Sequence, residues 1–272
     1  MHITQKYRKI ITAFYFYWLI HINKKIPVIV YQMGKVGSLS IKNSLEKAGI
    51  NPLFHVHRMN PVNIQEVRAQ YMLRNQKPQD ESVGFCLYKE IGLRKKKAKI
   101  ISSFREPISR NISAFFQNFE IISHKQNIKD NVNIHELILE FLSKYPHHVP
   151  LHWFDIELEK VLDINVYAYP FPKDRGYLVI RKKNIDLLLL KLEVPDTIKE
   201  LAISEFLQID DFHLLKKNIG EEKEYSNVYQ NFKRSIKLPS DYVDYMMNSK
   251  FTRHFYTNSE IFKFQNIWQN AE

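Results

Sequence analysis

The chain has 272 residues, of which 44% are hydrophobic and 25% charged, values that exclude a disordered protein and allow one sizeable domain or two small ones. Its 40 lysines and arginines exceed its 29 aspartates and glutamates, so the formal net charge is +11. This excess predicts a polyanionic partner, such as a phosphorylated ligand, an acidic glycan, an anionic membrane or nucleic acid. The single cysteine, Cys86, excludes an intrachain disulfide and a zinc cluster built on cysteines.

The N-terminal region carries an apolar, aromatic stretch over residues 10–20 with basic residues on both sides. This stretch is shorter than the roughly 20 apolar residues of a membrane-spanning helix, and no small-residue cleavage site follows it. The sequence therefore predicts that residues 1–26 form a helix that packs on the core. An interfacial helix that contacts a membrane surface through residues 6–25 is the alternative. We expect a cytoplasmic protein, which is membrane-associated in the alternative case.

From residue 27 onward, apolar runs typical of buried strands alternate with segments of helical periodicity. Residues 27–31 are the first such run, and a glycine-containing turn leads from it into a helix that begins at Ser38. Further strands are predicted at 53–56, 83–88 and 100–104, with helices at 60–75 and 107–119. The second half is predicted to hold helices at 133–144, 151–163, 195–207, 225–236 and 258–270, and a hairpin at 177–181 and 185–192.

This alternation predicts an α/β fold in which a central, mainly parallel sheet lies between two layers of helices. The helix-rich second half predicts a helical C-terminal portion. No repeat and no low-complexity linker interrupts the sequence. We therefore expect one α/β domain over residues 27–272.

The turn after the first strand, at residues 31–40, reads Tyr-Gln-Met-Gly-Lys-Val-Gly-Ser-Leu-Ser. A strand that enters a glycine-containing turn and opens a helix is an anion-binding design, since backbone N–H groups and the helix dipole face the ligand. In the ATP/GTP P-loop the lysine follows the second glycine, whereas here Lys35 precedes Gly37. The turn also lacks the Gly-x-Gly-x-x-Gly pattern of dinucleotide-binding folds. An ordinary strand-to-helix turn is the alternative.

A second candidate site follows the predicted strand at 100–104. Arg105 stands at the carboxyl end of that strand, where ligands bind in open α/β sheets, and a helix that starts at Pro107 places Ser113 about two turns inside. Arg105 and Ser113 are predicted to close on one phosphate, the arginine as a charged fork and the serine as a neutral donor. A structural salt bridge of Arg105 and an ordinary helix serine are the alternatives.

The turn at 35–40 and the segment at 105–113 both resemble motifs of a known protein superfamily. The order Lys-x-Gly-Ser-x-Ser at 35–40 resembles the 5′-phosphosulfate-binding loop of the sulfotransferase superfamily, and the Arg-x-Pro…Ser arrangement at 105–113 is similar to its 3′-phosphate motif. Longer phrases resemble the bacterial capsular polysaccharide synthesis family, which is itself sulfotransferase-like. These phrases lie at residues 30–38, 55–57, 104–116 and 254–256, and the resemblance runs from about residue 27 to Trp268.

The resemblance implies an enzyme that moves a sulfuryl group from 3′-phosphoadenosine 5′-phosphosulfate (PAPS) to a hydroxyl of a carbohydrate, in capsular or surface polysaccharide synthesis. It implies that Lys35 stabilises the oxygen between phosphate and sulfur, and that Arg105 and Ser113 hold the 3′-phosphate. No metal is implied, and the sequence holds no convincing metal-ligand set. The other donor-binding residues implied are Gly34, Val36, Gly37, Ser38, Leu39 and Ser40.

A general base must take the proton of the acceptor hydroxyl, and a histidine or glutamate with a pKa near neutrality does this best. His57 follows the second predicted strand and shares a strand face with His55. Glu90 follows the strand predicted at 83–88. We rank these two above His152, which stands at a histidine-rich helix start. A histidine without a chemical role is the alternative, and a His55–His57 metal pair lacks a third ligand nearby.

Two other function classes fit parts of the sequence. A small-molecule kinase would bind phosphates, but the Walker Lys-Ser/Thr pair and an evident Mg²⁺ carboxylate are missing. A non-enzymatic protein that binds nucleic acid or a glycan would account for the net charge and for the basic run at 94–99, and its affinity would fall steeply with salt. Under the leading hypothesis the partners are a nucleotide sulfate donor and a glycan acceptor, and nucleic acid is not a partner.

Overall fold

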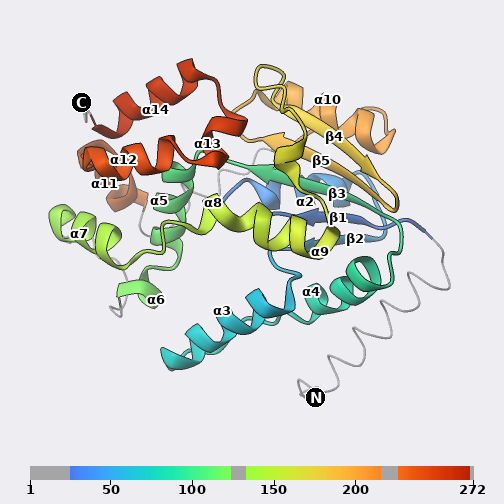
Figure 1. The fold of residues 1–272 in the computed structure, drawn as a ribbon, viewed down its shortest axis with the longest axis horizontal. Coiled ribbons are helices and arrows are strands. Elements are labelled where there is room, and N and C mark those ends of the chain that lie inside the picture. Colours follow the sequence, from blue (N-terminus) through green and yellow to red (C-terminus); the bar gives the residue numbers. More distant parts are fainter. Residues whose placement is uncertain (1–24, 124–132, 216–225, 270–272) are drawn as a thin grey trace. The chain divides into compact units, whose positions relative to one another are not determined.

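A computed structural model describes residues 25–123, 133–215 and 226–269 (Figure 1). The chain forms two compact units, which are described separately. Unit 1 comprises Met1–Phe104, Trp153–Tyr169 and Gly176–Leu215, and unit 2 comprises Arg105–His152, Pro170–Arg175 and Lys216–Glu272, each as far as it is described. The aromatic stretch at 10–20 lies outside the described residues. Within them, no helix has the length and apolar character to cross a membrane.

Unit 1 contains a five-stranded sheet in the order β2-β1-β3-β5-β4. Its strands are β1 (Val28–Tyr31), β2 (Leu53–Val56), β3 (Ala98–Phe104), β4 (Tyr177–Lys182) and β5 (Ile185–Lys191). Every neighbouring pair is parallel except β4 with β5, which forms the predicted antiparallel hairpin. All of β1 is buried, which explains its continuous apolar run. The predicted mainly parallel central sheet is confirmed.

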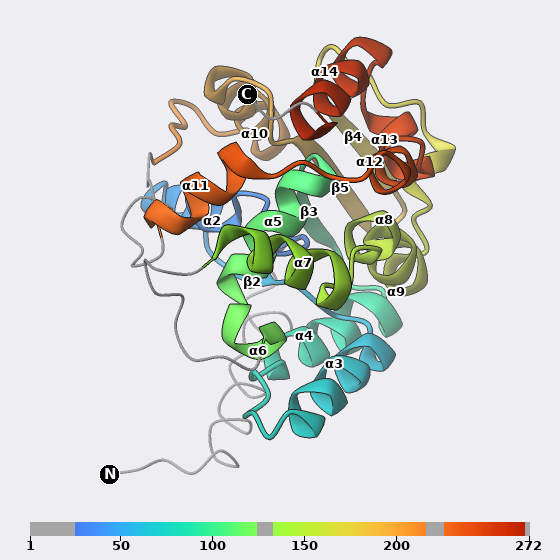
Figure 2. The same ribbon diagram turned by 90° about the vertical axis from the view of Figure 1, so that its left-hand side faces the viewer.

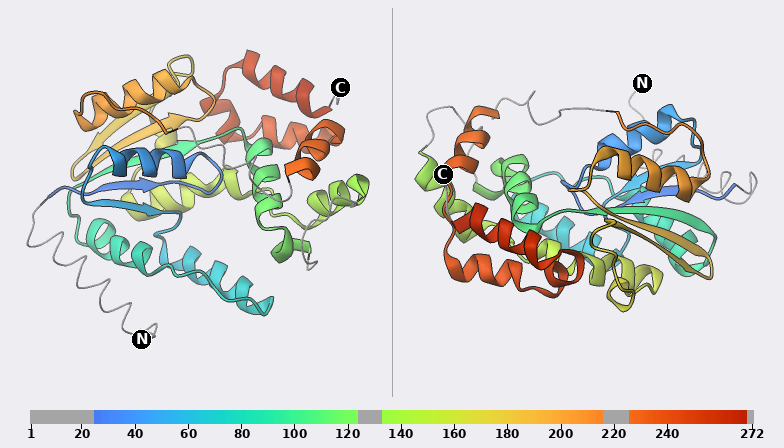
Figure 3. Two further views of the ribbon diagram at one scale, coloured as in Figure 1. Left: turned by 180° about the vertical axis from the view of Figure 1, so that it is seen from behind. Right: turned by 90° about the horizontal axis from the view of Figure 1, so that it is seen from above.

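Helices cover both faces of this sheet. The helical segments of unit 1 are α2 (Ser38–Lys47), α3 (Pro61–Leu73), α4 (Ser82–Leu87), η2 (Tyr88–Leu93), η3 (Phe154–Glu159), α9 (Lys160–Leu162), η4 (Val166–Ala168) and α10 (Asp196–Leu207). On one face, Ile41 of α2, Ile101 of β3 and Ile203 of α10 share one apolar core. On the other, the rings of Phe154 in η3 and Phe104 in β3 lie 6.2 Å apart. In Figure 1 α9 lies in front of the sheet, and from behind, in the left panel of Figure 3, α2 lies in front.

The chain changes its direction of travel across the sheet at β1. From β1 it passes through α2 to β2 on one side, and then through α3, α4 and η2 to β3 on the other side. The carboxyl ends of β1 and β3 therefore form a topological switch point, the place at which open α/β sheets bind ligands. Residues 32–37 follow β1 at this point.

The strand predicted at 83–88 is wrong, because this segment forms α4 and then the π-helix η2. Its apolar residues are not buried as a strand would bury them. The buried positions are Gly84, Leu87 and 90–92, and the spacing of 84, 87, 90 and 91 is that of a helix face. Gly84 fits because a Cβ there would lie 2.1 Å from the backbone oxygen of Arg58. A short apolar run of this kind is compatible with either structure, and its burial period decides.

Unit 2 is helical. Its helices are α5 (Pro107–Gln117), α6 (Phe119–Ser123), α7 (Ile134–Lys144), α8 (Val149–Trp153, whose last residue belongs to unit 1), α11 (Ser226–Ser235), α12 (Ser240–Met247), α13 (Lys250–Phe255) and α14 (Asn258–Gln269). Phe115 of α5, Phe141 of α7 and Phe232 of α11 form an aromatic core with ring separations of 5.5–6.3 Å. Figure 2 shows these three helices side by side. The predicted helical C-terminal portion is confirmed, with α12 and α13 in addition.

Candidate functional site

The turn after β1 holds an uncommon backbone conformation. Lys35 and Gly37 both lie in the left-handed region, with φ of 73° and 80°. Glycine suits position 37 for a second reason, since a Cβ there would lie 2.8 Å from Cδ1 of Leu192. A left-handed conformation costs a residue with a side chain about 1–2 kcal/mol, and such strain gathers at functional sites. The fold therefore holds Lys35 in a fixed and strained position.

Helix α2 begins directly after this turn, with Gly37 at its N-cap and with no acidic residue in its first turn. Its N-terminal amides and the positive end of its dipole are thus left without a capping side chain at the N-cap. Ser38 is buried at the first helical position. This arrangement favours an anion at residues 34–38.

The remaining predicted loop residues lie in different surroundings. Val36 is buried, and Leu39 is 44% exposed. The hydroxyl of Ser40 donates a hydrogen bond to the backbone oxygen of Leu215 at 2.8 Å. While this bond exists, that proton is not available to an anion, so Ser38 is the better placed of the two serines.

Gln32, which the sequence analysis missed, connects three strands at this edge of the sheet. Its side-chain oxygen accepts a hydrogen bond from the backbone N–H of Ser103 at 2.8 Å. The backbone N–H of Gln32 donates to the backbone oxygen of Val56 at 3.3 Å. Its backbone oxygen lies 2.8 Å from Nδ1 of His57. The side chain is fully buried. A polar residue between an apolar strand and a glycine turn was the signal that could have identified it.

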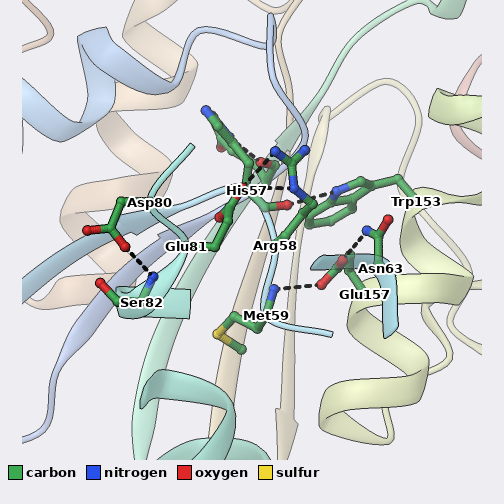
Figure 4. Close-up of polar contacts among 10 residues, drawn as sticks. His57, Arg58, Met59, Asn63, Asp80, Glu81, Ser82, Trp153 and Glu157 are labelled. Atoms are coloured by element: carbon green, nitrogen blue, oxygen red, sulfur yellow. Dashed lines mark hydrogen bonds and ion pairs between the residues drawn. The ribbon is translucent and has the colours of Figure 1, made fainter. Parts of the chain in front are cut away.

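The contact with Gln32 fixes the proton arrangement of His57. A backbone carbonyl only accepts, so Nδ1 carries the hydrogen and the lone pair of the neutral ring lies on Nε2. On the other side, the indole N–H of Trp153 donates to the backbone oxygen of His57 at 3.2 Å (Figure 4). The ring is thus held in the tautomer that a general base at Nε2 requires.

His55 shares a strand face with His57, and the two ring centroids lie 4.8 Å apart. Burial, followed by the charges of His57 and Lys42, lowers the pKa of His55 to about 4. His55 is therefore neutral near pH 7. No group of three potential metal ligands occurs among the described residues, so a metal pair of His55 and His57 gains no support.

Glu157 anchors the segment that follows His57. Its carboxylate accepts hydrogen bonds from the backbone N–H groups of Met59 and Asn60, at 2.8 and 2.9 Å, and from Asn63 Nδ2 and the hydroxyl of Tyr31. Figure 4 shows Met59 and Asn63 directed at Glu157. Burial is the largest influence on this carboxyl and raises its pKa. These contacts fix the backbone that carries His57.

The two other candidate bases are less well placed. Glu90 does not stand at the end of a strand as predicted, because residues 82–93 are helical. It is buried in η2 and forms an ion pair with Arg94. His152 is exposed in α8 and belongs to unit 2.

Arg105 and Ser113 belong to unit 2. Ser113 lies about two turns inside α5, as predicted. Glu106, the residue after Arg105, caps α5 by accepting from the N–H groups of Ile108 and Ser109 at 2.8 and 2.7 Å. Lys233 lies within electrostatic reach of Arg105, since burial and then the Arg105 charge lower its pKa. The Glu106 charge acts on Lys233 in the opposite direction, so one carboxylate already lies near these two cations.

Lys35 belongs to unit 1, whereas Arg105 belongs to unit 2. The joint grip of Lys35 and Arg105 on one nucleotide therefore stays a prediction.

A cavity of about 530 Å³ lies in unit 1, between α3 and α4. Arg58, Arg68, Tyr71, Lys77 and Phe85 are among its lining residues. Arg58 is held by two hydrogen bonds to Glu81, at 3.0 and 2.7 Å (Figure 4). Asp80 and Glu81 also line the cavity, so it carries aromatic side chains and charges of both signs, and its volume suits a small ligand.

Comparison with known proteins adds one finding. Residues 123–257 match a family model described as "Putative capsular polysaccharide synthesis protein". No curated protein matches the chain, and no solved structure matches it. The match supports the resemblance to the capsular polysaccharide synthesis family. The matched region contains His152 and Lys233 but neither Lys35 nor Arg105.

Proposed function

We propose that this chain is a sulfotransferase that moves a sulfuryl group from PAPS to a carbohydrate hydroxyl. The match to the family model supports only the setting of the proposal, which is capsular polysaccharide synthesis. The observation that carries the proposal is the turn at 32–37. It follows β1 at the topological switch point, holds Lys35 and Gly37 in the left-handed conformation and opens α2 without a capping side chain. We propose that the turn binds phosphosulfate in a P-loop-like way, with the lysine placed ahead of the second glycine.

In the proposed reaction the acceptor oxygen attacks sulfur, and the bond from sulfur to the 5′-phosphate oxygen breaks. Adenosine 3′,5′-bisphosphate leaves with the negative charge that builds on that oxygen. The Nζ of Lys35 and the amides at the start of α2 stabilise this charge. Positioning and charge stabilisation of this kind dominate the rate of such displacements.

His57 is the proposed general base, and it receives the proton of the acceptor hydroxyl on Nε2. Two contacts support this role above Glu90 and His152, namely the bond of Nδ1 to Gln32 and the anchoring of the next residues by Glu157. The ion pair of Glu90 with Arg94 weighs against the glutamate. A base held in one tautomer needs no rearrangement before it accepts the proton.

Arg105 and Ser113 are proposed to hold the 3′-phosphate. Burial is the largest cause that lowers the pKa of Lys233, and the Arg105 charge is the second. A phosphate dianion beside Arg105 would offset this second cause, which supports the assignment. The acceptor is proposed to bind in the cavity between α3 and α4, whose lining residue Arg58 directly follows His57.

Thermal melting with adenosine 3′,5′-bisphosphate, with ATP and without ligand tests the proposal. A ligand at ~100 times its dissociation constant adds ~2.7 kcal/mol of stability. We expect stabilisation by the bisphosphate alone. Stabilisation by ATP to the same extent would favour a kinase. Weak binding of every polyanion, with steep loss as salt is added, would favour a non-enzymatic binding protein.

A further inference from the structure

Two buried polar groups beside the turn have no hydrogen-bond partner within the described part of the chain. They are Nε2 of Gln32 and Oγ of Ser103, and both residues are almost fully buried, at 0% and 1% exposure. Leaving a buried donor without a partner destabilises a fold. Such groups in a native structure call for a reason, and an absent ligand is one.

The orientation of the Gln32 amide is fixed by its neighbour. The backbone N–H of Ser103 is a donor, so the side-chain atom that faces it at 2.8 Å must be the oxygen Oε1. The –NH₂ group of Gln32 therefore points away from that N–H. One hydrogen bond thus links the two residues. The Nε2 group of Gln32 and the hydroxyl of Ser103 both remain as donors without a partner among the described residues.

The position of Ser103 places its hydroxyl on the side of the sheet where the turn lies. Side chains alternate along β3, so Ser103 shares a face with Ile101, which packs against Ile41 of α2. The turn reaches the same end of the sheet, since Gly37 lies against Leu192, whose N–H bonds to the backbone oxygen of Phe104. Ser103 therefore lies under the turn that leads into α2.

We propose that Gln32 Nε2 and Ser103 Oγ are neutral donors to a tetrahedral oxyanion, a phosphoryl or sulfuryl group, which the turn at 33–38 holds. In the proposed function this group is the 5′-phosphosulfate of PAPS, so the identity of the nucleotide rests on that proposal. The two donors act together with the Lys35 cation and the N-terminus of α2. They bind those oxygens of the anion that Lys35 does not contact. Charge and neutral donors together orient the group as well as attract it.

Ser102 supplies a matched control. Its Oγ is also buried and without a partner in the described structure, but alternation places it on the opposite face of β3, the face of Phe104. The experiment titrates the wild type, Ser103→Ala and Ser102→Ala with adenosine 3′,5′-bisphosphate, ATP and inorganic sulfate, with thermal melting and calorimetry as readouts. We expect Ser103→Ala to lose roughly ten- to a hundredfold in affinity for the anion that binds, and Ser102→Ala to lose none.

Without ligand, Ser103→Ala is expected to melt no lower than Ser102→Ala, since neither hydroxyl makes a hydrogen bond. Gln32→Glu keeps the oxygen that Ser103 N–H needs and replaces the donor with a negative charge, so it is expected to lose binding as well. Equal affinity of Ser103→Ala and wild type, an equal loss in Ser102→Ala, or a lower melting point of Ser103→Ala alone without ligand would overturn the inference.

Titration with the three anions distinguishes the proposal that PAPS is the nucleotide from the proposal that Gln32 and Ser103 are donors. Binding of ATP or sulfate but not of the bisphosphate, weakened by Ser103→Ala, would reject PAPS and retain the two donors. Bisphosphate binding that Ser103→Ala leaves unchanged would retain PAPS and reject them. A wild type that binds none of the three anions would overturn both.

Discussion

Tyr31, at the end of β1, donates a hydrogen bond to Glu157, which lies 126 positions later in the chain, and both side chains are fully buried. The same carboxylate holds Met59 and Asn60 at the end of the neighbouring strand. Glu157 thus joins η3 to the last residue of β1 and to the segment that follows β2. Burial raises the pKa of Tyr31 well above 10, so its hydroxyl remains a donor.

Removal of this carboxylate is expected to destabilise unit 1. Glu157→Ala leaves several buried donors without a partner and should lower the free energy of unfolding by about 3 kcal/mol or more, measured in urea. Because the native pKa of Glu157 lies above its ordinary 4.5, native protein binds this proton more tightly than unfolded chain. The free energy of unfolding should therefore fall as pH rises from 4.5 to the raised pKa. Glu157→Gln should remove this slope, whereas Glu46→Gln, on the exposed side of α2, should retain it.

The two glycines of the turn are expected to respond differently to alanine. Gly37 has a positive φ and contacts Leu192, so Gly37→Ala should cost about 1–2 kcal/mol from the backbone alone, and more from the contact. Gly34 has neither constraint, since no atom lies within 4 Å of a Cβ built there. Chemical denaturation of both variants measures this difference. Equal stability of the two would contradict the conformation of the turn.

Lys35→Ala is expected to abolish sulfuryl transfer while the fold stays intact. The loss of one such electrostatic contact typically removes ~3–4 kcal/mol of transition-state stabilisation. Lys42→Ala is the matched control, because Lys42 lies in the helix that follows and pairs with Glu46 on the surface. Release of adenosine 3′,5′-bisphosphate from PAPS with a polysaccharide acceptor measures the rate. Retained turnover in Lys35→Ala would refute the role of this lysine.

His57→Ala is expected to reduce transfer by about 10²–10⁴-fold and to leave stabilisation by the bisphosphate unchanged, since a general base acts on the acceptor. His152→Ala serves as its control and should transfer at the wild-type rate. The reverse result, a slow His152→Ala and an active His57→Ala, would move the base to α8. Melting with and without the bisphosphate separates loss of chemistry from loss of donor binding.

Arg105→Ala is expected to remove stabilisation by the bisphosphate and to raise the pKa of Lys233, because one of the causes that lower it disappears. Nuclear magnetic resonance of isotope-labelled lysine side chains follows this titration. Added bisphosphate should raise the same pKa in the wild type. A Lys233 pKa that responds to neither change would place the 3′-phosphate elsewhere.

The sheet and its edge were predictable because their signals are local. A fully buried strand such as β1 must be apolar throughout, and the glycines of the turn mark the place where the backbone curls. The helical structure of the segment 83–88 was not predictable, because an apolar run of six residues fits a strand or a helix until its burial is known. The position of Gln32 between strand and turn was a usable signal, but its role, like that of Glu157, could not be predicted. Their roles depend on hydrogen bonds to Ser103 and Met59, partners that only the folded sheet brings close.

Helix α3 differs from the other elements around the sheet in that none of its residues is buried. It is anchored mainly at its start. There the side-chain oxygen of Asn60 accepts a hydrogen bond from the backbone N–H of Val62 at 3.0 Å, and Glu157 binds the backbone N–H of Asn60. A helix with so little buried surface opens locally at low free energy, so its amide protons should exchange early. One wall of the cavity can then yield. Under the proposed function, this would let the acceptor side admit sugars of different bulk, a tolerance that the strained turn proposed for the donor lacks.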